Sequence, residues 1–204
     1  MNRSIVALLA LAVTASCGDG GTDPGDLAAS GTVAFSYNGG ALLAAGSYSA
    51  TGGMPLTSND IESQTWAAGY RDPDENNNLA VMGSVSRSTR YDWALMYFDR
   101  STAGTSTIDV ANCTANSCAG MVFWYNQSSG SATAGEVYCG LETGTMTIAT
   151  ISNTRATGSF SGTGTCFTLD ATTESTFSVT NGSFDVPIIT DPGVGTGLMI
   201  RNQR

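Results

Sequence analysis

The stretch Tyr91-Asp92-Trp93-Ala94-Leu95-Met96-Tyr97 decides the fold class. Large apolar side chains stand at every second position in it, at Tyr91, Trp93, Leu95 and Tyr97. A period of two is the signature of a β-strand, because alternate residues of a strand face opposite sides of the sheet. The stretch therefore predicts a strand over residues 91–97.

Comparable short runs lie on both sides of this stretch. One of them, Val33 to Tyr37, precedes Asn38-Gly39-Gly40, which is typical of a hairpin turn. Beyond the first 16 residues, no window of 12 residues shows a helical period. About ten to twelve short strands separated by turn residues predict an all-β domain over residues 30–190. We expect an antiparallel β-sandwich, with a β-barrel as the alternative. The other expected strands cover residues 41–50, 66–70, 79–85, 120–126, 136–141, 145–151, 156–160, 167–169, 177–181 and 184–188.

The composition excludes several kinds of chemistry. The chain has no His, and arginine supplies all eight of its basic residues. His-dependent nucleophiles, His-ligated metals, Schiff bases and a phosphate-binding lysine are therefore excluded within this chain. Without Arg3 the chain has 17 acidic and 7 basic residues, a net charge of −10. This balance argues against nucleic acid as a partner.

The first 16 residues resemble a secretory signal. Arg3 is followed by an uncharged, largely apolar run that is too short to span a membrane. The small residues before Cys17 resemble the lipobox of bacterial lipoproteins, although Thr14 stands where that motif usually has Leu. The resemblance implies an exported protein whose Cys17 carries lipid, so that the membrane is a partner through a covalent anchor.

Two segments outside the domain read as unstructured. Residues 17–29 are rich in Gly and Asp and predict a flexible tether between the anchor and the domain. Residues 191–204 are expected to form a C-terminal tail. In the lipoprotein family the residue after the acylated Cys influences sorting. Gly18 is not the Asp associated with inner-membrane retention, so we expect the outer membrane of the cell envelope.

The segment Gly144–Ile188 carries a second resemblance. Its "Gly-x-Phe" and "Thr-Asn-Gly-x-Phe" strands, at Gly158 to Phe160 and Thr180 to Phe184, are similar to the C-terminal half of a group of uncharacterised β-rich bacterial lipoproteins. The function of that group is unknown. The resemblance therefore supports the fold class and implies no activity.

Four cysteines remain once Cys17 is set aside. In an oxidising envelope an even number predicts two disulfides, and three pairings are possible. We favour Cys113–Cys118 and Cys139–Cys166. The longer loop is expected to contribute on the order of 3 kcal/mol. A four-thiolate zinc site is the alternative, but the spacing of these cysteines suits it poorly.

The polar stretch between two expected strands offers candidate metal ligands. Asp72, Asp74, Asn76 and Asn78 place oxygen atoms at every second residue, as calcium loops do. Asn77 and Gly83 stand where the EF-hand pattern requires Gly and Glu. We therefore expect an ordinary hairpin loop, with no bound metal and no cofactor.

The aromatic residues provide the candidate binding surface. Trp66, Trp93 and Trp124 lie in alternating runs, so we expect most of them in the core. The run Phe123-Trp124-Tyr125 must put at least one ring on the outer face, which makes Trp124 the candidate contact for a sugar or peptide.

We therefore predict a lipid-anchored binding or structural module without catalytic activity, whose ligand or protein partner is unknown. The alternative is a hydrolase of envelope polysaccharide that uses a carboxylate pair such as Glu136 with Glu142, or Asp92 with Asp99.

Overall fold

The described part of the chain is nearly all β-strand. The computed structural model describes residues 12–13, 29–54, 64–72, 76–87, 90–113, 118–126, 136–189 and 198–199. Ten strands, β2 to β11, form one hydrogen-bonded sheet, and the two-residue strands β1 (Ala12–Val13) and β12 (Leu198–Met199) pair with each other. The predicted all-β class and strand number are confirmed.

The ten strands follow one another along the chain, and within the described residues a 3-10 helix, η3 (Val110–Asn112), follows β7. Their bounds are β2 (Ser30–Gly39), β3 (Leu43–Gly53), β4 (Trp66–Asp72), β5 (Asn78–Arg87), β6 (Arg90–Tyr97), β7 (Gly104–Asp109), β8 (Gly120–Asn126), β9 (Glu136–Ile151), β10 (Arg155–Thr168) and β11 (Glu174–Ile189).

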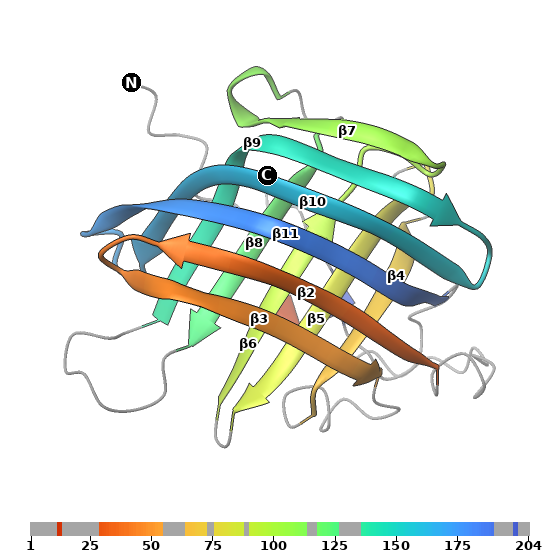
Figure 1. The fold of residues 1–204 in the computed structure, drawn as a ribbon, viewed down its shortest axis with the longest axis horizontal. Helices are drawn as coiled ribbons and strands as arrows, with labels where there is room; N and C mark the ends of the chain where they lie inside the picture. The colour runs from red at the N-terminus through yellow and green to blue at the C-terminus, as the bar shows by residue number, and fades with distance from the viewer. Residues whose placement is uncertain are drawn as a thin grey trace.

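The strands make two layers that cross each other (Figure 1). The front layer has the order β7-β9-β10-β11-β2-β3, and β8, β6, β5 and β4 run behind it. Two long strands belong to both layers. The first half of β9 pairs with β8 and its second half with β7, while the end of β11 pairs in parallel with β4. Sandwiches with crossed layers are joined at their corners by such shared strands. Because β10 also pairs with β11, the order of paired strands forms a closed ring. The two layers nevertheless pack face to face as a sandwich.

Bulges allow the shared strands to bend without losing their pairing. In β9 the register with β10 shifts between Leu141 and Thr143, which leaves Glu142 as the extra residue. From there the buried side chains of β9 change from odd to even positions. In β11 the register with both neighbours shifts around Asn181, which has a φ of +54°. A bulge adds one residue to one strand and bends it.

The structure corrects some of the strand boundaries predicted from the sequence. Three pairs of expected strands, between residues 136 and 188, are three continuous strands, β9, β10 and β11. In β9 and β11 the alternation breaks at a bulge, and such a break is indistinguishable in sequence from the end of a strand. In β10 the alternation continues, but Ser, Gly and Thr occupy the positions between Phe160 and Cys166. β7 was not predicted at all, because its run of small polar residues contains one large apolar side chain, Ile108.

The main core fills the space between the layers. Phe35 and Tyr48 of the front layer contact Phe123 of the back layer, with ring centroids 5.2 and 5.4 Å apart. Phe98 and Phe184 meet in the same way further along. A second buried cluster lies on the other side of the back layer and includes Met54, Trp66, Met82, Leu95 and Ile189.

Candidate functional site

A row of aromatic side chains crosses the outer face of the back layer and ends at the end of β10, which pairs with the first half of β9. The strands β4, β5, β6, β8, β9 and β10 each contribute one residue, and each residue lies opposite the next in the ladder. In this order they are Trp66, Ser84, Trp93, Trp124, Tyr138 and Phe167. We call these six residues the aromatic row. They come from six strands, so no short sequence motif reveals them.

The rings at the centre of the row contact one another. Trp124 lies against Trp93 at 6.0 Å, against Tyr91 at 5.0 Å and against Tyr138 at 5.9 Å between ring centroids. The first two contacts are edge-to-face and the third is stacked. All four rings are half-buried. These four rings therefore present an apolar surface with part of each ring exposed, whereas Trp66 and Ser84, at one end of the row, are buried.

The structure corrects the expectation that most of the tryptophans lie in the core, and it agrees with the expectation that Trp124 faces outward. Trp66 is buried, but in the second cluster, and none of the three tryptophans belongs to the main core. Within Phe123-Trp124-Tyr125, Phe123 is fully buried between the layers and Trp124 faces the other way. The candidate Trp124 thus lies at the centre of an aromatic surface.

Two polar atoms of the row are buried without a hydrogen-bond partner in the described part of the chain. They are the indole Nε1 of Trp124 and the hydroxyl of Ser84. A buried polar group left unpaired costs about 1–3 kcal/mol. An acceptor or donor supplied by a ligand would recover part of that free energy.

A carboxylate and a phenol stand together at one side of Trp124. Tyr138 donates a hydrogen bond of 3.2 Å to Glu136. Burial, followed by the charge and hydrogen bond of Glu136, raises the pKa of Tyr138 to about 12. The phenol therefore stays protonated at neutral pH and holds the carboxylate in place.

Glu136 and Glu142, the first candidate carboxylate pair for a hydrolase, lie far apart on β9. Glu136, Tyr138, Gly140 and Glu142 face outward in succession. Six residues of strand span roughly 20 Å, whereas the two carboxylates of a glycosidase lie about 5 to 9.5 Å apart. Glu136 and Glu142 therefore do not flank a single glycosidic bond.

The second candidate pair, Asp92 with Asp99, is also widely separated. Asp92 is completely buried on β6, and Asp99 lies beyond the other end of that strand. Ser106 donates to the carboxylate of Asp99, and Arg100 approaches the same oxygen at 3.7 Å. At about 3.3 Å per residue the two carboxylates are again more than about 20 Å apart along the chain.

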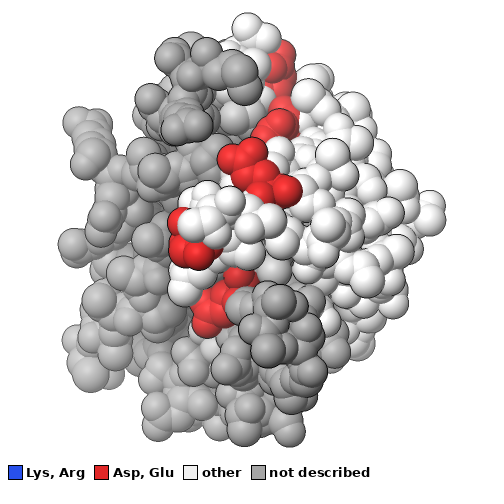
Figure 2. All heavy atoms as spheres, turned by 90° about the vertical axis from the view of Figure 1, so that its left-hand side faces the viewer, with Lys and Arg blue, Asp and Glu red and all other residues white. Residues whose placement is uncertain are grey.

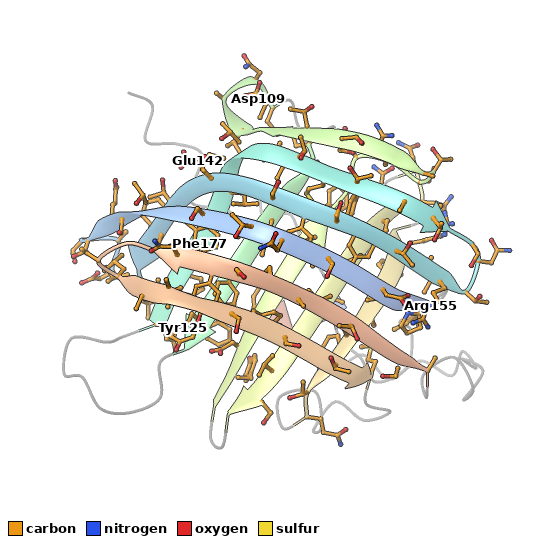
Figure 3. The ribbon with its side chains drawn as sticks, in the orientation of Figure 1. Asp109, Tyr125, Glu142, Arg155 and Phe177 are labelled. Atoms are coloured by element: carbon orange, nitrogen blue, oxygen red, sulfur yellow. A yellow bond between two sulfur atoms is a disulfide. The ribbon has the colours of Figure 1, made fainter. Side chains whose placement is uncertain are left out.

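Acidic side chains gather at one end of the sandwich. Figure 2 shows a line of them there, and no described basic side chain is visible on that face. Asp109 and Glu142 lie at this end, and Arg155 lies at the opposite end (Figure 3). Asp170 and Glu174, in the β10–β11 hairpin, are exposed as well. Because Glu174 faces Phe167 across the ladder, the aromatic row ends at this acidic surface.

The described arginine side chains are engaged elsewhere. Arg71 donates to the backbone oxygens of Ser101 and Ser152, both at 3.1 Å. Arg155 pairs with Asp185, which raises the pKa of the guanidinium. These contacts tie loops and strands together.

Two disulfides join Cys113 to Cys118 and Cys139 to Cys166, the pairs favoured from the sequence. Cys139 and Cys166 face each other in the β9–β10 ladder and are both buried in the main core. The other disulfide closes a short loop after η3, where Cys113 is exposed. No group of three or more metal-ligating side chains occurs among the described residues.

The candidate calcium loop connects β4 to β5. Asp72 and Asn78 lie opposite each other at the end of the β4–β5 ladder. Asn76 has a left-handed backbone with a φ of +58°. Asn78 is buried and donates a hydrogen bond of 3.3 Å to the hydroxyl of Tyr97. Asp74 lies outside the described residues, as do Cys17, the rest of the predicted tether up to residue 28, and all of the predicted tail except Leu198–Met199. Of the predicted signal, only Ala12–Val13 is described.

The comparisons with known proteins give no relative. No protein-family model, no curated protein and no solved structure matches this chain. Within the described residues no helix has the length and apolar character needed to cross a membrane. The resemblances to lipoproteins stay predictions.

Proposed function

We propose that the protein is an exported binding module, held on the cell envelope by lipid on Cys17, that binds a neutral sugar on the aromatic row. The observation that carries the proposal is the row itself, in which Trp93, Trp124 and Tyr138 present partly exposed rings side by side on three strands. Aromatic rings offer the flat apolar surface on which the C–H faces of sugars pack.

The polar groups around the rings favour a sugar over an anion or an oily ligand. The unpaired Nε1 of Trp124 requires an acceptor, and the carboxylate of Glu136 accepts from donors. Sugar hydroxyls provide both. Glu136 lies beside Tyr138 and Glu174 lies opposite Phe167, and negative charge at these two places disfavours phosphates and nucleic acids. The carboxylate distances give no support to the hydrolase alternative.

Affinity electrophoresis through gels that contain neutral polysaccharides tests the sugar. We expect the wild-type chain to be retarded by at least one of them. Trp124→Ala should abolish the retardation, and Trp124→Phe, which keeps a ring but loses the N–H, should weaken it. Leu169→Ala is the matched control, because Leu169 is an exposed apolar residue in the β10–β11 turn and not part of the row. Equal retardation of Trp124→Ala and the control would contradict the proposal.

Labelling of cells with a radioactive fatty acid tests the anchor separately. The label should mark the wild type and not Cys17→Ser. An unlabelled, freely soluble wild type would refute the anchor, and it would leave the sugar site to be judged by the gels. Export is compatible with the two disulfides, which form in oxidising compartments.

A further inference from the structure

The two edges of the front layer differ in how they are protected. β7 forms one edge, has six residues and ends at the charged Asp109. β3 forms the other edge, has 11 residues and contains no Asp, Glu, Lys, Arg or Pro. In Figure 1, β3 is the lower boundary of the front layer, and among the described strands it hydrogen-bonds only to β2.

Natural edge strands carry features that stop other strands from adding to them. Charged side chains, Pro, bulges and short length are the usual ones, because an open edge presents unpaired N–H and C=O groups. The irregularity in β3 is confined to its start, between Leu43 and Gly46. From Gly46 to Gly53 the pairing with β2 is regular, so over this length the strand has none of these features.

The outward side chains along this edge are small, and they alternate with buried ones. Ser47, Ser49 and Thr51 are exposed, whereas Tyr48 and Ala50 point into the core. No charge stands within the strand to repel an approaching neighbour. A strand added here would extend both the outer face and the core of the front layer.

We propose that β3 is the contact between two copies of this chain, which pair antiparallel through this edge about a two-fold axis at Ser49. Such an axis puts Ser49 opposite its own copy, Ser47 opposite Thr51, and Tyr48 opposite Ala50. Every outward hydroxyl then meets another hydroxyl, and the large ring meets a small methyl. A two-fold interface requires a surface that is complementary to itself, and this strand satisfies the requirement. The contact is independent of the sugar site, which lies on the other layer.

Sedimentation of the purified full-length chain tests the contact. We expect a dimer for the wild type. Ser49→Lys should raise the dimer dissociation constant at least tenfold, because it brings two positive charges face to face. Ser159→Lys is the matched control, since Ser159 is also exposed on the same face but lies in the central strand β10. A wild-type monomer would overturn the proposal, as would a Ser49→Lys dimer as stable as the control.

A disulfide formed between copies provides the second measurement. Ser49→Cys should give a cross-linked dimer on a non-reducing gel, because residues directly opposite each other in an antiparallel pair lie about 4.5–5.5 Å apart. Ser159→Cys should stay uncross-linked. Equal cross-linking of the two variants would show random collision and would refute the two-fold contact.

Discussion

The disulfide between Cys139 and Cys166 should be the more stabilising of the two. It closes a loop with a sequence separation of 27, whereas the separation between Cys113 and Cys118 is 5. Loop-closure entropy then gives about 3.5 kcal/mol for the long loop and about 2 kcal/mol for the short one. Burial widens the difference, because alanines at the buried pair leave a gap in the main core and alanines at the exposed pair do not.

Urea unfolding of two double variants measures this difference. Cys139→Ala with Cys166→Ala should lower the free energy of unfolding by at least about 3 kcal/mol, and Cys113→Ala with Cys118→Ala by no more than about 2 kcal/mol. The m-value should rise more in the first variant, since its unfolded chain loses the larger constraint. The reasoning is refuted if the exposed pair costs as much as the buried pair.

Three further predictions follow from single positions. Gly144→Ala should destabilise the protein by several kcal/mol in urea unfolding, because its Cβ would lie 2.2 Å from a backbone oxygen and its φ is +152°. Gly120→Ala, where a Cβ would meet no atom within 4 Å, should cost less than about 1 kcal/mol; similar losses would contradict the close approach. In absorbance titration of tyrosinate, Tyr138→Phe should remove the component near pH 12. Because the pKa of Tyr138 in the folded protein lies above the ordinary value of 10.0, this phenol stabilises the fold below about pH 10, and that contribution is lost as pH rises toward 12. An unchanged titration would show that another tyrosine is the last to ionise. Calcium should leave the melting temperature unchanged, and Asp72→Asn with Asp74→Asn should change stability by less than about 0.5 kcal/mol; a calcium-dependent rise lost in that variant would reveal a metal site.

Local patterns were sufficient to predict most strands, because a period of two survives wherever a strand separates core from solvent. The hairpin at Asn38-Gly39-Gly40 was predictable for a similar reason. Gly40 has a φ of +59° and its N–H bonds to the side chain of Asn38, both of which are local properties of these residues. Cysteine count and spacing left three pairings possible, and the favoured one is the pairing found.

The bends and the aromatic row were beyond sequence reasoning. The Glu142 and Asn181 bulges shift the alternation by one residue, and the sequence does not say whether the ladder continues. The neighbours of Trp124 come from β6 and β9, and which strands lie beside β8 is decided by the packing of the whole sandwich. The outward orientation of the Trp124 side chain was predictable only because two other aromatic residues, Phe123 and Tyr125, flank it.

The place of β11 in the sheet fixes the order in which the molecule is completed. β2 pairs with β11 on the side away from β3. The hydrogen bond from the backbone N–H of Ala41 to the hydroxyl of Ser175 joins residues 134 positions apart. The ribosome therefore makes the β2–β3 hairpin long before the strand that it must join. Contacts of such long range form slowly. During that interval both sides of an uncharged hairpin are open, so the nascent chain is most prone to aggregation at its N-terminal strands, and chaperone binding should concentrate there.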